Sequence, residues 1–159
     1  MTNRNNTRRL HAAAGAIALF TIGCFMGSTL WSEFTQDPAM ISQVKTTILM
    51  LMPFLVVAMA VVSRCGFKLA GNSTAGAVGK KWARMKIIGP NGLLILVPAS
   101  IYLARKAEAN AFDTAFNIVQ VIELIAGSVN IVLLALNMRD GMTIRTRRLS
   151  AREIGNPGN

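Results

Sequence analysis

The sequence predicts an all-α integral membrane protein, an up-down-up-down bundle of four transmembrane helices. Apolar residues make up 52% of the 159-residue chain and charged residues only 15%, with a mean hydropathy of +0.44. The charges are clumped, so four stretches of about 20 residues or more carry almost none, and each is long enough to cross a hydrocarbon core as a helix. Soluble proteins rarely bury four such helices in succession, so the membrane class is favoured.

The first predicted span covers residues 12–32 and follows a polar cytoplasmic segment, residues 1–11. A cleaved export signal is the alternative for this span, because Arg8 and Arg9 precede its apolar run. The chain stays apolar after Cys24, whereas a cleaved lipoprotein would turn polar there. The apolar region of a signal is also usually shorter. A retained span is therefore expected.

The other three spans are predicted at residues 44–63, 85–104 and 114–138, with a basic cytoplasmic loop, residues 64–84, and a basic tail, residues 139–159. Short loops join the first span to the second and the third to the fourth, as in an up-down bundle. Near the start of the third span, Gly89-Pro90-Asn91-Gly92 weakens the helix. We expect the helix to begin there, with Pro90 in its first turn. The alternative is a broken segment that lines a cavity.

Lysine and arginine are distributed unequally between the two sides of the predicted bundle. The N-terminal segment, the basic loop region and the tail carry 14 of the 17, whereas the other side carries Lys45, Arg105 and Lys106. Positive residues accumulate on the cytoplasmic side, so both termini are expected in the cytoplasm of a bacterial cell, at its cytoplasmic (inner) membrane. The net charge of +10 then favours membrane lipids with anionic headgroups as partners, and nucleic acid is not expected.

Glu123 is the most informative residue, because an acidic group inside a span costs on the order of 3 kcal/mol on insertion scales. It shares one helix face with Gln120, Gly127 and Asn130, and this face is expected to point into the bundle. No second ionisable group is expected at its depth. These polar residues, with Asn91 of the third span, form a candidate intramembrane site. The site either locks the helices together by hydrogen bonds or carries protons or contacts a ligand.

Glycines mark the faces where helices are expected to approach closely. Gly23 and Gly27 form a GxxxG pair, Gly15 lies on the same face, and Gly127 lies in the polar face of the fourth span. Such glycines let a second helix pack against them. The partner is expected to be a helix of the bundle or of another protomer.

His11 is the single histidine and the weak candidate for cofactor binding. A haem in a helical bundle usually needs two axial ligands, so no cofactor is expected, and His11 is expected to face headgroups or a neighbouring asparagine. Haem held between His11 residues of two copies is the alternative, with a pH response as a further role.

The sequence lacks the motifs of familiar enzymes. It has no phosphate-binding glycine loop, no HExxH, no paired carboxylates and no Ser/His/Asp set on one side of the membrane, so catalysis is not expected. The favoured function is a non-enzymatic accessory or scaffold subunit of a larger membrane complex, as a homo-oligomer or with a partner membrane subunit. The alternatives are a small proton-coupled transporter or carrier using Glu123, and a haem- or quinone-associated redox subunit using His11.

Overall fold

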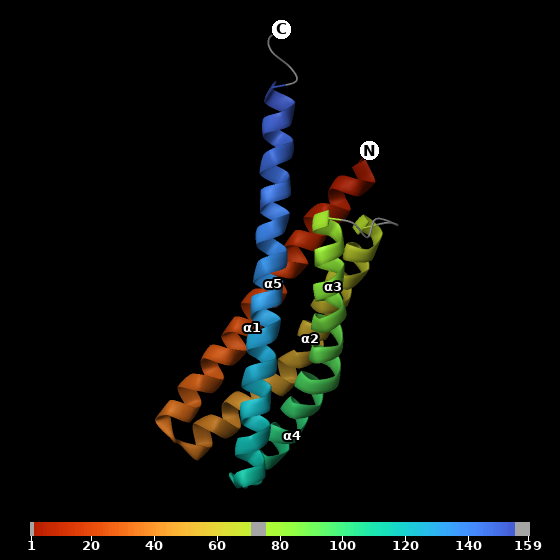
Figure 1. Ribbon diagram of the computed structural model, residues 1–159. Helices are drawn as coiled ribbons and strands as arrows, with labels where there is room; N and C mark the ends of the chain where they lie inside the picture. Colours follow the sequence, from red (N-terminus) through yellow and green to blue (C-terminus); the bar gives the residue numbers. More distant parts are fainter. Residues whose placement is uncertain (1, 71–75, 155–159) are drawn as a thin grey trace.

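The described part of the chain is helical apart from two short connections, residues 36–37 and 109–113. The computed structural model describes the backbone of residues 2–70 and 76–154, and the side chains of residues 5–69, 79 and 82–143. Its elements are α1 (Thr2–Thr35), α2 (Pro38–Ala70), α3 (Gly76–Pro90), the π-helix η1 (Asn91–Leu96), α4 (Val97–Glu108) and α5 (Thr114–Ile154). Since α3, η1 and α4 follow one another without a break, they form one rod (Figure 1).

Four helical segments are long and apolar enough to cross a membrane: residues 5–35, 38–69, 82–108 and 114–143. Each contains one of the spans expected from the sequence, which supports a multi-pass membrane protein. Figure 1 shows these segments running alternately up and down, with the start of α1 and the end of α5 at one end. We call this end the terminal end and the opposite end the short-loop end. The helices extend beyond the expected spans, and α5 continues through much of the basic tail to Ile154.

The two connections at the short-loop end each contain a residue that ends one helix and an aspartate that caps the next. Gln36 (φ 53°) and Asn110 (φ 51°) adopt the left-handed conformation that ends a helix. After each of them an aspartate caps the next helix. Asp37 accepts a hydrogen bond from the N–H of Ala39 at 3.0 Å, and Asp113 accepts one from the N–H of Phe116 at 2.9 Å.

The third helix does not begin at Gly89–Gly92, contrary to expectation. Its backbone is already helical from Gly76 and continues through Pro90. The Gly89–Gly92 stretch instead spans the junction of α3 and η1. In η1, the N–H of Val97 bonds to the carbonyl of Gly92, five residues back. Pro98 has no N–H to give to an ordinary helical turn, and the wider turn lies directly before it. Such π-helical turns are frequent at functional sites.

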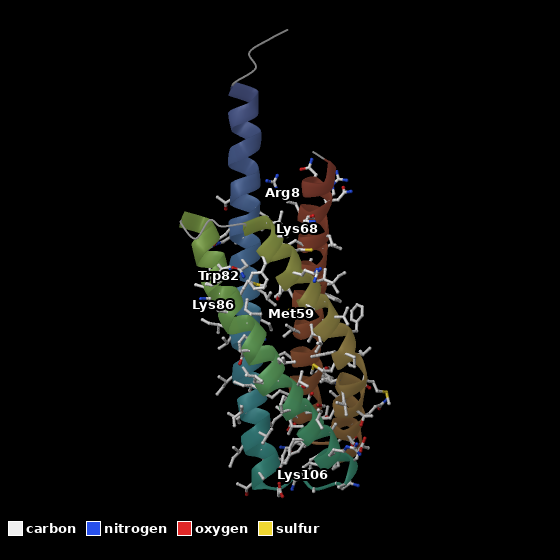
Figure 2. The ribbon with its side chains drawn as sticks, turned by 90° about the vertical axis from the view of Figure 1, so that its right-hand side faces the viewer. Arg8, Met59, Lys68, Trp82, Lys86 and Lys106 are labelled. Atoms are coloured by element: carbon white, nitrogen blue, oxygen red, sulfur yellow. The ribbon has the colours of Figure 1, made fainter. Side chains whose placement is uncertain are left out.

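Each membrane helix packs against two neighbours. Both α1 and the α3–η1–α4 rod contact α2 on one side and α5 on the other. Consequently α2 and α5 lie diagonally across the bundle. The two ends of the bundle differ in their charged groups (Figure 2). Lys86 stacks on Trp82 toward the terminal end, 3.6 Å from the ring centroid, and Lys106 pairs with Asp113 at the short-loop end at 2.6 Å.

The core consists of two hydrophobic clusters separated by a polar layer. The small cluster, near the short-loop end, contains Ile41, Leu103, Ala107 and Phe116, and the larger one contains Ala18, Ile22, Ile48, Met52, Leu55, Ala58, Ile88 and Leu134. Between them along the helices lies a set of polar side chains that we call the polar layer. Its members are Thr29, Ser32, Glu33, Lys45, Ser100, Gln120 and Glu123.

Candidate functional site

An ion pair lies at the centre of the polar layer. The ammonium of Lys45 donates a hydrogen bond to Oε2 of Glu123 at 2.6 Å. The side chain of Lys45 is 1% exposed and that of Glu123 is 13% exposed. A second ionisable group therefore lies beside Glu123, contrary to expectation. An unpaired charge there would be very costly, and the pair offsets much of that cost.

The pair joins two helices that are not packed neighbours. Lys45 comes from α2 and Glu123 from α5, which face each other across the bundle. The lysine side chain crosses the interior to reach the carboxylate. Thr29 of α1 lies alongside, its hydroxyl oxygen 3.5 Å from the ammonium of Lys45. The ion pair is therefore a diagonal link through the middle of the bundle, and breaking it would remove this link.

Lys45 was missed because it lies close to the predicted loop and carries the charge expected of a loop residue. A signal for its burial does exist in the sequence. Ile41, Lys45, Ile48 and Met52 are spaced by four, three and four residues, which places them on one helix face. All four are buried. A lysine in phase with the core residues of its helix predicts an inward side chain that needs a partner.

Two oxygens of the polar layer have no hydrogen-bond donor within the described part of the chain. Gln120 is 5% exposed, and its amide nitrogen donates to Oε2 of Glu123 at 3.4 Å. Its own oxygen, Oε1, is buried and lacks a partner among the described residues, as does Oε1 of Glu33. Lys45 and Glu123 both interact electrostatically with Glu33. Buried polar atoms normally have partners, so the layer has more acceptors than donors.

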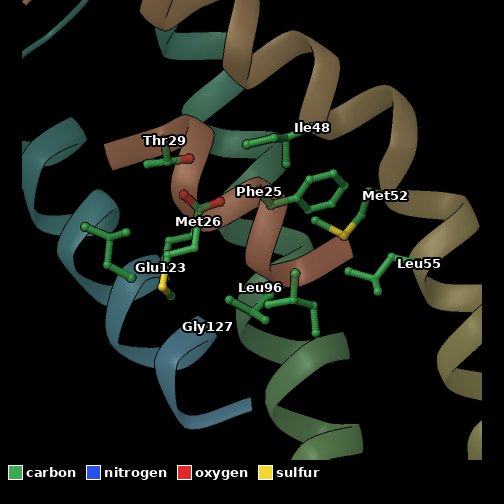
Figure 3. A pocket seen from close by; sticks show the side chains of 11 residues that line it. Phe25, Met26, Thr29, Ile48, Met52, Leu55, Leu96, Glu123 and Gly127 are labelled. Carbon is green, nitrogen blue, oxygen red and sulfur yellow. The ribbon is translucent and has the colours of Figure 1, made fainter. Parts of the chain in front are cut away.

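A small cavity adjoins the ion pair on the side of the larger hydrophobic cluster. Its volume is about 40 Å³, which is enough for one or a few water molecules. Glu123 and Thr29 are the polar groups of its lining (Figure 3). The rest of the lining is apolar, formed by Ile22, Phe25, Met26, Ile48, Met52, Leu55, Leu96, Leu124 and Gly127.

The other two predicted site residues form a separate contact. Asn91, in η1, donates hydrogen bonds to Oδ1 of Asn130 and to the carbonyl of Ala126, each at 2.8 Å. Asn130 is 1% exposed. It lies seven residues beyond Glu123 on α5, which corresponds to about 10 Å along the helix axis. The predicted site therefore divides in two: Glu123 with Gln120, and Asn130 with Asn91.

The predicted packing glycines also divide into two kinds. Gly127 is buried, and a Cβ placed on it would lie 3.1 Å from the terminal methyl of Met26. It allows α1 and α5 to approach. Gly23 and Gly27 are exposed, and a Cβ on either of them, or on Gly15, would meet nothing within 4 Å. The GxxxG face therefore points away from the described bundle.

His11 contacts α2 near the terminal end. Its Nδ1 lies 3.0 Å from the carbonyl oxygen of Val62, and its ring packs beside Gly66. The sequence expectation placed it against headgroups or an asparagine, whereas this contact joins α1 to α2. Among the side chains that the structure describes, no three His, Cys, Asp or Glu residues gather as a metal site would require.

Comparison with known proteins found no matching family model, no matching curated protein and no matching solved structure.

Proposed function

We propose that the protein is a small carrier that moves protons across the membrane, in which Glu123 gains and loses a proton and Lys45 is its counter-charge. The observation that carries this proposal is the buried ion pair between them. Ionisable residues inside membrane spans are costly, and where they occur they mark ion pathways and proton relays. The pair and the acceptor oxygens without donors among the described residues lie in the polar layer, and the water-sized cavity adjoins this layer at Glu123 and Thr29.

Proton exchange at this pair would have a structural effect. When Glu123 is protonated, it loses its charge, and the ammonium of Lys45 loses its main partner. Because the pair joins α2 to α5 across the bundle, its opening loosens the diagonal link while the neighbouring helices stay packed. A carrier needs such an element with two arrangements, one for each protonation state.

An accessory or scaffold subunit is the second candidate, and the exposed GxxxG face favours it. Gly23 and Gly27 lie in a membrane helix with open space beside them. Small residues of this kind let another membrane helix pack closely. Purification in mild detergent tests this role, since a scaffold should bring its partner with it, and Gly23→Leu should release that partner.

Proton flux in liposomes tests the carrier proposal. The purified chain is reconstituted with a trapped pH-sensitive dye, and a potassium diffusion potential drives protons inward. The wild-type chain should acidify the lumen faster than empty liposomes do. Glu123→Gln and Lys45→Met should reduce the rate to that of empty liposomes, because each removes one member of the pair.

The matched control is Glu108→Gln, which removes an exposed carboxylate at the end of α4. It should keep the wild-type rate. The carrier proposal is wrong if wild-type and empty liposomes acidify equally, or if Glu123→Gln conducts as well as the wild-type chain.

A further inference from the structure

The polar layer contains one carboxylate more than it has ammonium groups. Lys45 contributes one positive charge, whereas Glu123 and Glu33 each contribute a negative charge when ionised. Lys45 and Glu123 neutralise each other at 2.6 Å. The remaining charge belongs to Glu33, and a net charge inside a low-dielectric layer is unfavourable.

The hydrogen-bonding groups of the polar layer show a related imbalance, because acceptors outnumber donors. Oε1 of Glu33 and Oε1 of Gln120 are both buried acceptors without donors among the described side chains. Gln120 is more than nine-tenths buried, and its amide already contacts Glu123. A single proton added to Glu33 would remove the excess charge and convert one acceptor into a donor. A metal cation would also neutralise the excess negative charge of the polar layer, but the ammonium of Lys45 repels it.

Glu33 lies nearer the short-loop end of the bundle than the ion pair does. It lies two residues before the end of α1, about 3 Å along the helix axis from the short loop. Lys45 lies about 10 Å into α2 from Pro38. On α2 and α5, Ile41 and Phe116 of the small hydrophobic cluster lie between the pair and the short-loop end. Glu33, on α1, is only partly buried.

We propose that Glu33 is the entry site for the proton, and that in the resting state it holds this proton while Lys45 and Glu123 stay paired. The inference rests on the carrier function proposed above. The proton then moves from the carboxyl of Glu33 to the carboxylate of Glu123. The ammonium of Lys45 exchanges partners in the opposite sense, from Glu123 to Glu33. One proton and one ammonium change places, and the net charge of the layer stays at zero throughout.

Infrared difference spectroscopy of the purified chain in detergent tests the assignment. Because Glu33 holds its proton in the resting state, raising the pH should remove the carbonyl stretching band of a buried protonated carboxylic acid, and returning to the resting pH should restore it. Glu33→Gln should abolish this band and lower proton uptake by about one proton per chain. Glu33→Asp keeps the acid but changes its chain length, so it should shift the band. Glu123→Asp should leave the band where it is.

Exposed Glu108 supplies the control, because Glu108→Asp should not move the band of a buried acid. A thermal unfolding scan of each variant shows whether it is folded, and Glu33→Asp provides a variant that keeps the acid group should Glu33→Gln fail to fold. The assignment is overturned if the band shifts in Glu123→Asp and not in Glu33→Asp. That result would leave the carrier proposal intact. Liposomes without proton flux would refute the carrier proposal whatever the infrared assignment.

Discussion

The strength of the Lys45–Glu123 pair can be measured with a double-mutant cycle. At a separation of 2.6 Å and an effective dielectric constant of about 20, the Coulomb attraction is about 6 kcal/mol. Desolvation of both groups offsets part of this attraction, and removing one partner of a buried pair costs about 3–5 kcal/mol. We therefore expect Lys45→Met and Glu123→Leu each to lower the free energy of unfolding by about 3 kcal/mol or more.

The double variant should be more stable than either single variant, because it leaves no buried charge unpaired. The assay is equilibrium unfolding of the purified chain in mixed micelles with increasing denaturing detergent. Lys106→Met serves as the matched control, since it breaks the ion pair to Asp113 at the short-loop end. That pair lies in contact with solvent, and its loss should change stability little. If the effects of the two single variants simply add in the double variant, the pair contributes no coupling and the reasoning fails.

Three further predictions concern other contacts. Gly127→Leu should destabilise the fold by about 1–3 kcal/mol through overpacking against Met26, whereas Gly23→Leu should leave unfolding unchanged. Asn91→Leu should cost about 1–3 kcal/mol by leaving a buried asparagine without its partner, and thermal unfolding in detergent checks both variants. The hydrogen bond from Lys106 and the N–H of Phe116 lower the pKa of Asp113. The stability that Asp113 contributes is therefore present above its unfolded pKa of about 4 and is lost as the pH falls through its lower folded pKa. An acid titration of the melting temperature should be flatter in Asp113→Asn.

The four helices could be predicted from the sequence because a membrane span needs about 20 apolar residues. The hydropathy of the sequence shows directly where such apolar stretches lie. The ends of the helices could not be predicted in this way, because a helix can continue past the apolar region into polar sequence. This is why α5 reaches Ile154. Glu33 falls in the predicted short loop, although it belongs to α1. Lys45 falls at the very start of the predicted second span, whereas α2 begins seven residues before it.

The candidate site was predicted in part. The polar face of α5 identified Gln120 and Glu123, because spacing within one helix fixes which residues share a face. The partner on α2 depends on how far a long side chain reaches across the bundle, and local spacing does not encode that distance. Asn91 and Asn130 also belong to the predicted site and contact each other, but Asn91 lies in η1, which the sequence did not predict. A regular helical repeat cannot reveal such a turn.

The π-helical turn also has a consequence for how the third membrane helix tolerates changes in length. Each hydrogen bond of η1 spans one residue more than an ordinary α-helical bond, so the segment behaves as an α-helix with one inserted residue. Deletion of Leu94, which is exposed, would let the turn close into regular α-helix and leave the faces of α3 and α4 in register. The same deletion within α2 would rotate everything beyond it by about 100°. If the core residues after Lys45 kept their places, Lys45 would point away from Glu123. If Lys45 kept its place, those core residues would turn toward lipid.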